Sequence, residues 1–431
     1  MLEYGYRGKL LPINPRYGEI AGLPCYPSIE AVPETPDLAL IGLSAEASPA
    51  ALEACGRRGV RAAVVFSGGF GEMGETGQAL QDRLVEVADR YGIALCGPNC
   101  LGFVNFPLAA ACTFTATFDS VDLLAGPIAF VSQSGALGAY IYALARTRNL
   151  GFSYFISTGN EAQIDFASYV DFLVDKPEVG LILGYLESAR DGAALLRAAD
   201  RARLAGKPVV LLKVGRSASG ARAARSHTGS LAGADRIYDA AFRQHGIIRA
   251  DTIEAMLDVA YLHTVGGIPR GPGVAVSSIS GGAGVILADE IDARGLRLAQ
   301  LAPETRAQLR QFVPAFGSIE NPVDTTAQPL NDPEILRGCL ATLAHDPGVD
   351  TVIPFNGPLV EYAETLSRAI AAVADERKSL VLANWLLAPP SARRALEAHG
   401  VPVFDDPSRA VKALAALVEW SRRRERARAG P

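Results

Sequence analysis

The hydrophobic residues of this chain gather in short, continuous runs, and most runs are followed by a stretch with helical spacing. The runs rarely alternate with polar residues, which is typical of strands buried on both faces of a parallel sheet. Between them lie stretches such as residues 191–206, which have helical spacing and a terminal glycine. This alternation predicts an α/β protein with parallel sheets and right-handed crossovers. The predicted strands are residues 9–14, 37–43, 61–67, 92–97, 127–134, 152–160, 179–187, 208–215, 273–280, 350–357, 379–386 and 401–406.

Two breaks in this series divide the chain into three predicted domains. With 431 residues, the chain is longer than one compact core usually requires. The pattern is interrupted by LLAGP near 123–127 and by the linker-like VGGIPRGPG at 265–273. We therefore predict domains at 1–124, 125–266 and 267–431. The second and third open alike, with VSQSGALG and SSISGGAG, which predicts a repeated doubly wound domain.

Composition narrows the class of protein. Apolar residues make up 49% of the chain and charged residues 20%, as in ordinary globular proteins. The net charge of −5 gives no electrostatic reason to expect nucleic acid or an anionic membrane as a partner. The six cysteines lack the spacing of a metal site, and reduced thiols are the simplest account of them. Without a leader or a long apolar run, we expect a soluble cytoplasmic protein.

Two strand-to-helix turns are candidates for binding an anion. After the run 127–134, Ser134 and Gly135 lead into a helix, whose free N–H groups and positive dipole end favour negative charge. The stretch STGNEAQID (157–165), which contains Asn160, has the same order of strand, turn, acidic residues and helix. A simple capped turn explains each stretch equally well, so both interpretations stay open at this point.

His227 stands in RSHTGSLAG (225–233), among small polar residues that lack the bulk to form a core. The segment before it carries Lys213, Arg216, Arg222 and Arg225, which suits a mobile, electropositive loop. The segment after it has a helical pattern, so His227 is expected beside a helix N-terminus, where a phosphorylated imidazole is favoured over an imidazolium. A metal role lacks a second ligand, and a Ser-His-Asp triad lacks its nucleophile turn. An exposed loop histidine without a function remains the alternative.

The stretch around His227 resembles the phosphohistidine motif of the NDP-forming acyl-CoA synthetases, the superfamily that includes succinyl-CoA synthetase. Further segments resemble that family in the same order and extend the likeness over nearly the whole chain. The likeness is to the α-type half of these enzymes. It implies a Rossmann-like CoA-binding domain followed by two flavodoxin-like doubly wound domains with parallel sheets. The further segments are PINPRYGEIAGLPCYPSI (12–29), CGPNCLGFVN (96–105), VSQSGALG, STGNEAQID and ENPVDTTA (320–327).

The resemblance also implies a mechanism and roles for individual residues. In that family an ATP-grasp domain phosphorylates the histidine, here His227, and the phosphate passes to a carboxylate to give an acyl phosphate, from which the CoA thiol displaces phosphate. Glu187 matches the carboxylate that orients the histidine. The turns expected to hold the phosphoryl group contain Ser134, Gly135, Asn160, Gly229 and Ser230. The positions that match the CoA site are Arg16, Tyr17, Ser67 and Gly68.

The resemblance further implies what lies outside the printed sequence. The family's first strand and Gly-rich turn, which cradle CoA phosphates, would precede residue 1, so the first domain is expected to lack them. No ATP-grasp pattern occurs in the chain, so ATP or ADP and Mg²⁺ are expected on an ATP-grasp partner, either a β-type subunit or a fused domain. The substrates are then a small carboxylic acid and coenzyme A, and the assembly is expected to be oligomeric.

Two other functions are compatible with the sequence. A related protein acyltransferase could use this region as an acyl-CoA sensor, and a non-catalytic scaffold could simply bind CoA. Formation of ADP and acyl-CoA indicates a synthetase, acyl transfer to lysine without ADP indicates the sensor, and the absence of both reactions leaves the scaffold.

Overall fold

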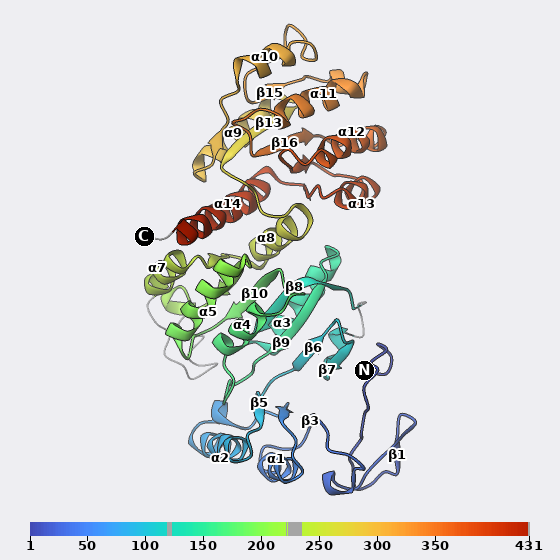
Figure 1. Cartoon of the computed structure of the whole chain (residues 1–431), viewed down its shortest axis with the longest axis vertical. Coiled ribbons are helices and arrows are strands. Elements are labelled where there is room, and N and C mark those ends of the chain that lie inside the picture. Colours follow the sequence, from blue (N-terminus) through green and yellow to red (C-terminus); the bar gives the residue numbers. More distant parts are fainter. Residues whose placement is uncertain (119–122, 221, 223–234, 430–431) are drawn as a thin grey trace. The chain divides into compact units, whose positions relative to one another are not determined.

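The computed structural model describes residues 1–118, 123–220, 222 and 235–429 of the chain. The described residues form two compact units, Met1–Asp251 and Thr252–Pro431. In this part of the chain no helix is both long and apolar enough to cross a membrane. Figure 1 shows the chain with its elements labelled, and each unit is described by itself below.

The first unit begins with a two-stranded hairpin, β1–β2. A small parallel sheet of three strands follows, in the order β3-β4-β5. Helices α1 and α2 pack against one another, and the sheet and helices share a core that includes Leu52, Val65 and Leu84. The bounds are β1 Glu19–Ile20, β2 Leu23–Pro24, β3 Leu38–Ile41, β4 Ala62–Val65, β5 Ala94–Cys96, α1 Ser48–Arg57 and α2 Glu75–Tyr91.

A seven-stranded sheet forms the larger part of the first unit, in the order β12-β11-β10-β8-β9-β6-β7. The strands β8 to β12 pair in parallel, whereas β6 pairs antiparallel with both β9 and β7. Every residue of β9, β10 and β11 is buried, as the apolar runs predict. The bounds are β6 Gly102–Asn105, β7 Ala110–Cys112, β8 Ala125–Ser132, β9 Phe152–Ser157, β10 Leu181–Leu186, β11 Val209–Lys213 and β12 Ile248–Arg249.

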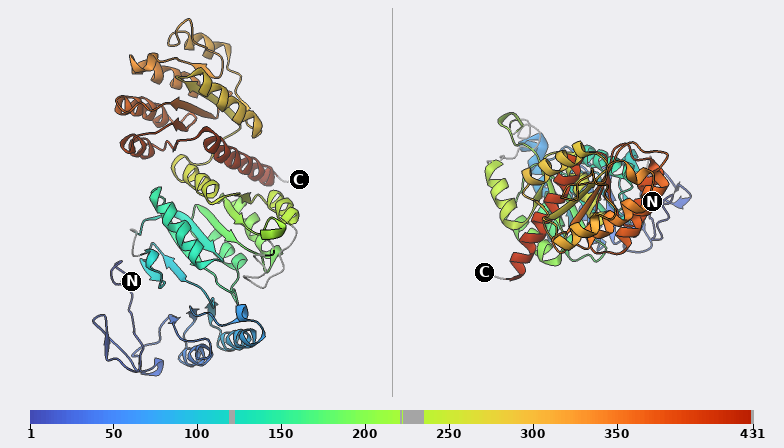
Figure 2. Two further views of the ribbon diagram at one scale, coloured as in Figure 1. Left: turned by 180° about the vertical axis from the view of Figure 1, so that it is seen from behind. Right: turned by 90° about the horizontal axis from the view of Figure 1, so that it is seen from above.

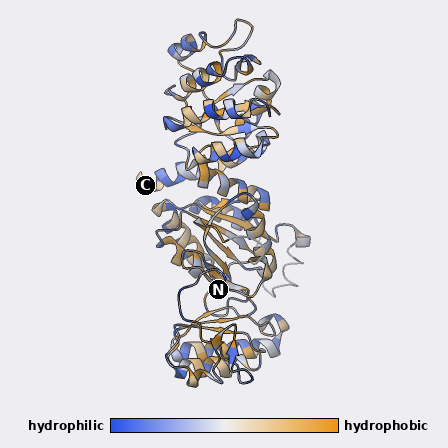
Figure 3. Cartoon of the chain, turned by 90° about the vertical axis from the view of Figure 1, so that its right-hand side faces the viewer, coloured by the Kyte–Doolittle hydropathy of each residue, from blue (hydrophilic) through white to orange (hydrophobic). Residues whose placement is uncertain are grey.

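Helices cover this sheet and begin at recognisable caps. Asp165 accepts a hydrogen bond from the Ser168 N–H at 2.9 Å, and Asp191 accepts one from the Ala194 N–H at 2.8 Å. The predicted helix at 191–206 ends at Gly206, whose φ of +83° is the left-handed conformation that favours glycine. In Figure 3 the strands are largely hydrophobic, while the outer helices are mixed. The bounds are α3 Gly135–Thr147, α4 Phe166–Val174, α5 Gly192–Ala205 and α7 Asp235–His245.

The second unit contains one parallel sheet in the order β14-β13-β16-β18-β19, with β15 beside β13 and β17 beside β16. The long helix α14 packs on α8 and α9, and Figure 2 shows α8 and α14 side by side from behind. The strands are β13 Gly273–Ser278, β14 Arg297–Leu298, β15 Val323–Asp324, β16 Thr351–Asn356, β17 Leu380–Val381, β18 Ala383–Trp385 and β19 Val403–Phe404. The helices are α8 Ile253–Gly266, α9 Gly281–Ala293, α10 Pro303–Leu309, α11 Pro333–Ala344, α12 Ala363–Asp375, α13 Pro390–Ala398 and α14 Pro407–Ala429.

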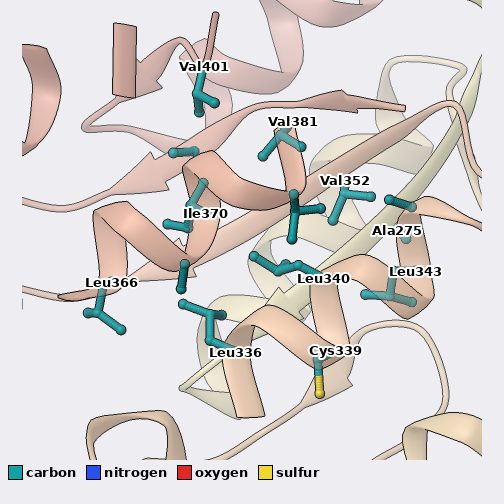
Figure 4. Close-up of a cluster of buried hydrophobic side chains, with 14 of the residues drawn as sticks. Ala275, Leu336, Cys339, Leu340, Leu343, Val352, Leu366, Ile370, Val381 and Val401 are labelled. Carbon is teal, nitrogen blue, oxygen red and sulfur yellow. The ribbon is translucent and has the colours of Figure 1, made fainter. Parts of the chain in front are cut away.

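A continuous hydrophobic core lies between this sheet and α11, α12 and α13. Leu340 and Ile370 point from the helices toward Val352 and Val381 of the sheet, as Figure 4 shows. All four side chains are at most 2% exposed. Burying such a side chain contributes about 1.5–3 kcal/mol, so this face holds the unit together.

The α/β class and the parallel sheets follow the sequence prediction, and the structure departs from it in detail. Residues 9–14 form no strand, because Pro12 lacks an N–H, and only Ile13 makes an isolated bridge, to Tyr26. The hairpin β6–β7, inside the predicted first domain, joins the sheet of the following segment. The helix α8 belongs to the second compact unit. The three-domain division stays a prediction.

Candidate functional site

The carboxyl ends of β8, β9 and β10 meet at one edge of the seven-stranded sheet. Ser132 pairs in register with Ser157 on one side and with Tyr185 on the other. The chain leaves these three strands through the turns that contain Ser134, Glu161 and Glu187. Open parallel sheets bind ligands at this edge, because the strands end there and the helix N-termini face it.

Gln133 ties these turns together through its side-chain amide. Its Oε1 accepts from the backbone N–H groups of Glu187 at 2.6 Å and of Ser188 at 3.1 Å. Its Nε2 donates to the Ser188 carbonyl and to Glu161 Oε1, both at 2.8 Å. Gln133 thus accepts two hydrogen bonds and donates two, which is the full capacity of a primary amide. If the amide were flipped, its N–H groups would face the backbone N–H groups of Glu187 and Ser188. The orientation of Gln133 is therefore determined by its neighbours.

Glu161 is a buried carboxylate on the turn after β9, with 2% of its surface exposed. Its Oε1 also accepts from the Thr158 hydroxyl at 2.9 Å, while its Oε2 is buried without a hydrogen-bond partner among the described residues. Burial raises the pKa of Glu161 to about 7, against hydrogen bonds from Gln133 and Thr158 that lower it. Its φ of +56° is unusual for a residue with a side chain.

Glu187 follows β10 directly and is 8% exposed. Two neighbouring groups respond to its charge. Burial raises the pKa of Tyr185 to about 12, and the Glu187 carboxylate adds to the shift. Burial lowers the pKa of the Lys213 ammonium, while Asp235 and Glu187 work to raise it. Lys213 lies over the Tyr238 ring at 4.6 Å and donates to the Val214 carbonyl. A carboxylate and a buried cation thus share this end of the sheet.

Ser134 and Gly135 begin α3 at the same edge. Ser134 occupies the N-cap position without a side-chain capping bond, and its carbonyl accepts from the Ser132 hydroxyl at 2.6 Å. A Cβ at Gly135 would lie 2.9 Å from Leu101 Cγ, which is closer than real Cβ contacts. Packing therefore favours glycine at this position, and the uncapped helix start leaves N–H groups that suit a phosphoryl oxygen.

Asn160 lies on the turn after β9, but its side chain faces the three-stranded part of the unit. Its Nδ2 donates to Glu72 Oε2 and to Gln81 Oε1, the latter at 3.0 Å, and its Oδ1 accepts from Asn99 Nδ2 at 3.2 Å. The structure thus brings Asn160 to the turns that follow β4 and β5 rather than to Glu187. Its predicted contact with phosphate stays a prediction.

The residues predicted for CoA fall into two groups. Ser67 and Gly68 follow β4, and the buried Ser67 Oγ has no hydrogen-bond partner in the described part of the chain. A Cβ at Gly68 would lie 3.0 Å from Glu72 Oε1, so this turn runs close to its neighbours. Arg16 and Tyr17 lie on an exposed loop where Asn14 Oδ1 accepts from the Arg16 N–H at 3.0 Å. Among the described residues no hydrogen bond joins Arg16 or Tyr17 to Ser67 or Gly68.

His227, Gly229 and Ser230 lie outside the described residues. Within the described ranges, no group of three or more His, Cys, Asp or Glu side chains could hold a metal ion. The cysteines are free thiols.

Three residues of this edge, Gln133, Glu161 and Thr158, are not among the site residues predicted from the sequence. All three stand inside the motifs VSQSGALG and STGNEAQID. Their position, as polar residues in motifs that follow a predicted strand, is the sequence feature that could have indicated them. Nothing local in the sequence shows that Gln133 reaches across two turns.

Three family models of CoA-binding and CoA-ligase domains match successive parts of the chain. Residues 1–105 match the family model described as CoA binding domain, residues 125–263 the succinyl-CoA ligase like flavodoxin domain, and residues 274–423 the ligase-CoA domain.

Relatives and solved structures show the same likeness over nearly the whole chain. The α-subunit of ADP-forming acetate–CoA ligase II from Pyrococcus furiosus is 39% identical over 96% of this chain and 90% of that protein. ADP-forming acetate–CoA ligase I from Archaeoglobus fulgidus is 39% identical over 97% of this chain, which spans 59% of that protein. The dinucleotide-forming acetyl-coenzyme A synthetase 1 of Candidatus Korarchaeum cryptofilum, in complex with phosphate and ADP, superposes with a TM-score of 0.89 at 33% identity. The match covers 98% of this chain and 91% of that one.

Proposed function

The chain belongs to the NDP-forming acyl-CoA synthetase superfamily, and we propose that its phosphoryl relay runs through His227 at the carboxyl edge of the seven-stranded sheet. The chain is the α-type part of an ADP-forming acyl-CoA synthetase, in keeping with relatives named as ADP-forming acetate–CoA ligases and their α-subunits. It uses CoA and a nucleotide and works with a partner subunit or fused domain. The alternatives of an acyl-CoA sensor and a scaffold are set aside for this function.

The proposed reaction consists of two phosphoryl transfers followed by one acyl transfer. A ring nitrogen of His227 attacks the γ-phosphorus of ATP, forming an N–P bond as ADP leaves. A carboxylate oxygen of the acid then attacks phosphorus, the N–P bond breaks, and an acyl phosphate forms. The CoA thiol loses its proton and attacks the acyl carbon, which releases phosphate and gives the thioester. Covalent catalysis by the imidazole divides one difficult condensation into easier steps.

The placement of Glu187 is the observation that supports this proposal most. It is buried at the end of β10, its backbone is held by Gln133, and the N-terminus of α3 opens at the same sheet edge. A carboxylate held in this way can take the N–H of one imidazole nitrogen and leave the other free to attack. Ser134, Gly135, Gly229 and Ser230 would then hold the phosphoryl group.

The CoA-binding role rests on the family match at residues 1–105 and on the turn after β4. The unpartnered Ser67 Oγ is a polar group that a ligand can satisfy, so Ser67 and Gly68 fit the pantetheine of CoA. Arg16 and Tyr17, on their exposed loop, would contact the nucleotide end.

The partner would carry the ATP-grasp fold, with ATP or ADP and Mg²⁺ bound there. Reduced cysteines suit a cytoplasmic enzyme, and the partner assembly would be oligomeric. The acid is a small carboxylic acid, for which acetate is the first to test because the relatives are named for it.

The test uses the chain purified together with its ATP-grasp partner. With ATP, acetate and CoA, the complex should form ADP, phosphate and acetyl-CoA. With γ-³²P-labelled ATP alone, this chain should acquire acid-labile, base-stable label at His227. His227→Ala should abolish both without loss of stability, because the small polar residues around it in the sequence lack the bulk to form a core. Label on another residue, or synthesis that survives in His227→Ala, contradicts the relay.

A further inference from the structure

The turn that carries Glu161 is held at both ends by backbone hydrogen bonds. The Asn160 N–H donates to the Pro98 carbonyl at 2.9 Å, and the Ala162 N–H donates to the Gly97 carbonyl at 3.0 Å. Between these two anchors the backbone at Glu161 takes its positive φ. The side chain is thereby directed into the protein, where Gln133 and Thr158 meet it. A strained residue kept in place by its surroundings marks a candidate functional position.

The chemistry of the Glu161 side chain also indicates a functional position. A buried carboxylate with one oxygen unpartnered weakens a fold, and an apolar residue would serve packing better. What Glu161 supplies in return is one acceptor, Oε1, for the second N–H of Gln133. With that acceptor in place, the amide of Gln133 has one orientation. Its Oε1 then faces the N–H groups of Glu187 and Ser188.

We propose that Glu161 is a positioning residue for the phosphoryl relay, acting through Gln133 on the backbone that carries Glu187. This inference rests on the proposed function, in which Glu187 orients the histidine. In this role Glu161 acts through its hydrogen bond with Gln133 and does not itself need to contact the substrate. Its effect is to hold the carboxylate of Glu187 where the imidazole must meet it, and small displacements of an oriented group cost large factors in rate.

The proposal separates two properties of Glu161, its acceptor oxygen and its charge. Glu161→Ala removes the acceptor, whereas Glu161→Gln keeps an amide oxygen that can accept from Gln133 and Thr158. Positioning requires only the acceptor, so Glu161→Gln should rescue turnover. A purely structural role would instead lower stability in Glu161→Ala and leave the turnover of the folded enzyme unchanged.

The experiment measures kcat and KM for acetyl-CoA synthesis by the complex of this chain with its ATP-grasp partner, well below the unfolding temperature. For Glu161→Ala we expect kcat to fall by about tenfold or more, with KM for ATP and CoA within about twofold of the wild type. For Glu161→Gln we expect kcat within about threefold of the wild type. Gln133→Ala should lower kcat similarly, and adding Glu161→Ala to it should cause little further loss, because both act through one contact.

A matched control is Asp346→Asn, which alters another buried carboxylate. Asp346 accepts from the backbone N–H groups of Ala302 and Gly348, both at 2.8 Å, and its replacement should lower stability while kcat is kept. A wild-type complex that makes no thioester overturns the proposed function together with this inference. A working wild type whose Glu161→Ala variant keeps its turnover, or in which the Gln133 and Glu161 effects multiply independently, overturns the positioning role alone.

Discussion

The amide of Asn160 donates a hydrogen bond to the carboxylate of Glu72, although 88 residues separate them in the sequence. This contact joins the turn after β9 to the turn between β4 and α2, and so connects the seven-stranded sheet with the three-stranded one. Burial works to raise the pKa of Glu72, but hydrogen bonds from Asn160 and from the Gly69 N–H prevail, and its pKa is lowered. The turn that carries Glu161 is thus anchored by a charged acceptor.

Asn160→Ala should lower the free energy of unfolding by about 1 kcal/mol, because it removes a hydrogen bond to a partly exposed carboxylate. Denaturant unfolding followed by circular dichroism measures the change. Asn331→Ala serves as the control, since Asn331 is exposed and should shift stability by less than about 0.5 kcal/mol. Equal effects of the two variants would show that the contact contributes nothing.

Glu161 should make stability fall as pH rises. Burial raises its pKa in the folded protein from 4.5 to about 7, so the folded state binds the proton more tightly than the unfolded state. The contribution of Glu161 to the free energy of unfolding is complete below about pH 4.5 and is lost as pH rises through about 7. This contribution is at most about 3 kcal/mol. The charge of Asp165, the N-cap residue of α4, also raises the pKa of Glu161. Tyr169 lies on α4, and its own pKa is raised by burial, by the neighbouring Cys96 and Cys100, and by the Glu161 charge.

Glu161→Gln imitates the neutral form and should therefore weaken this pH dependence. Thermal unfolding of both proteins between about pH 5 and about pH 8 tests it: the wild type should lose more stability across that range than the variant. Parallel curves would contradict the assignment of this titration to Glu161.

His263, near the end of α8, should make the stability of the protein decline as the pH becomes acidic. Burial lowers its pKa to about 4, and its Nδ1 is buried without a partner in the described structure. As pH falls below about 6.5 the unfolded state takes up a proton first, so stability declines until about pH 4. His263→Leu should reduce the decline, as measured by thermal unfolding. The matching change at the half-exposed His345 is the control, and a decline unchanged in His263→Leu would exclude His263 as its source.

Gly135→Ala should lower stability by about 1–3 kcal/mol, because the new methyl group would press on Leu101. Leu101→Ala in the same chain should recover part of the loss by making room. Gly192→Ala, where a Cβ meets nothing within 4 Å, should be neutral or stabilising. A Gly135→Ala variant as stable as the wild type would show that α3 can move away from Leu101.

The sequence by itself determined the class of fold, most of the strands and both ends of the helix at 191–206, because these depend on local periodicity and on the capping residues Asp191 and Gly206. It also identified the stretch around His227 and the family, since motif residues keep their order along the chain. Only the tertiary structure decided that β6 and β7 join the larger sheet and that residues 9–14 form no strand. Gln133 lies 28 residues from Glu161 and 54 from Glu187, and their hydrogen bonds exist because three parallel strands end at one edge. Contacts over such separations depend on how strands pair in space, which no local pattern records.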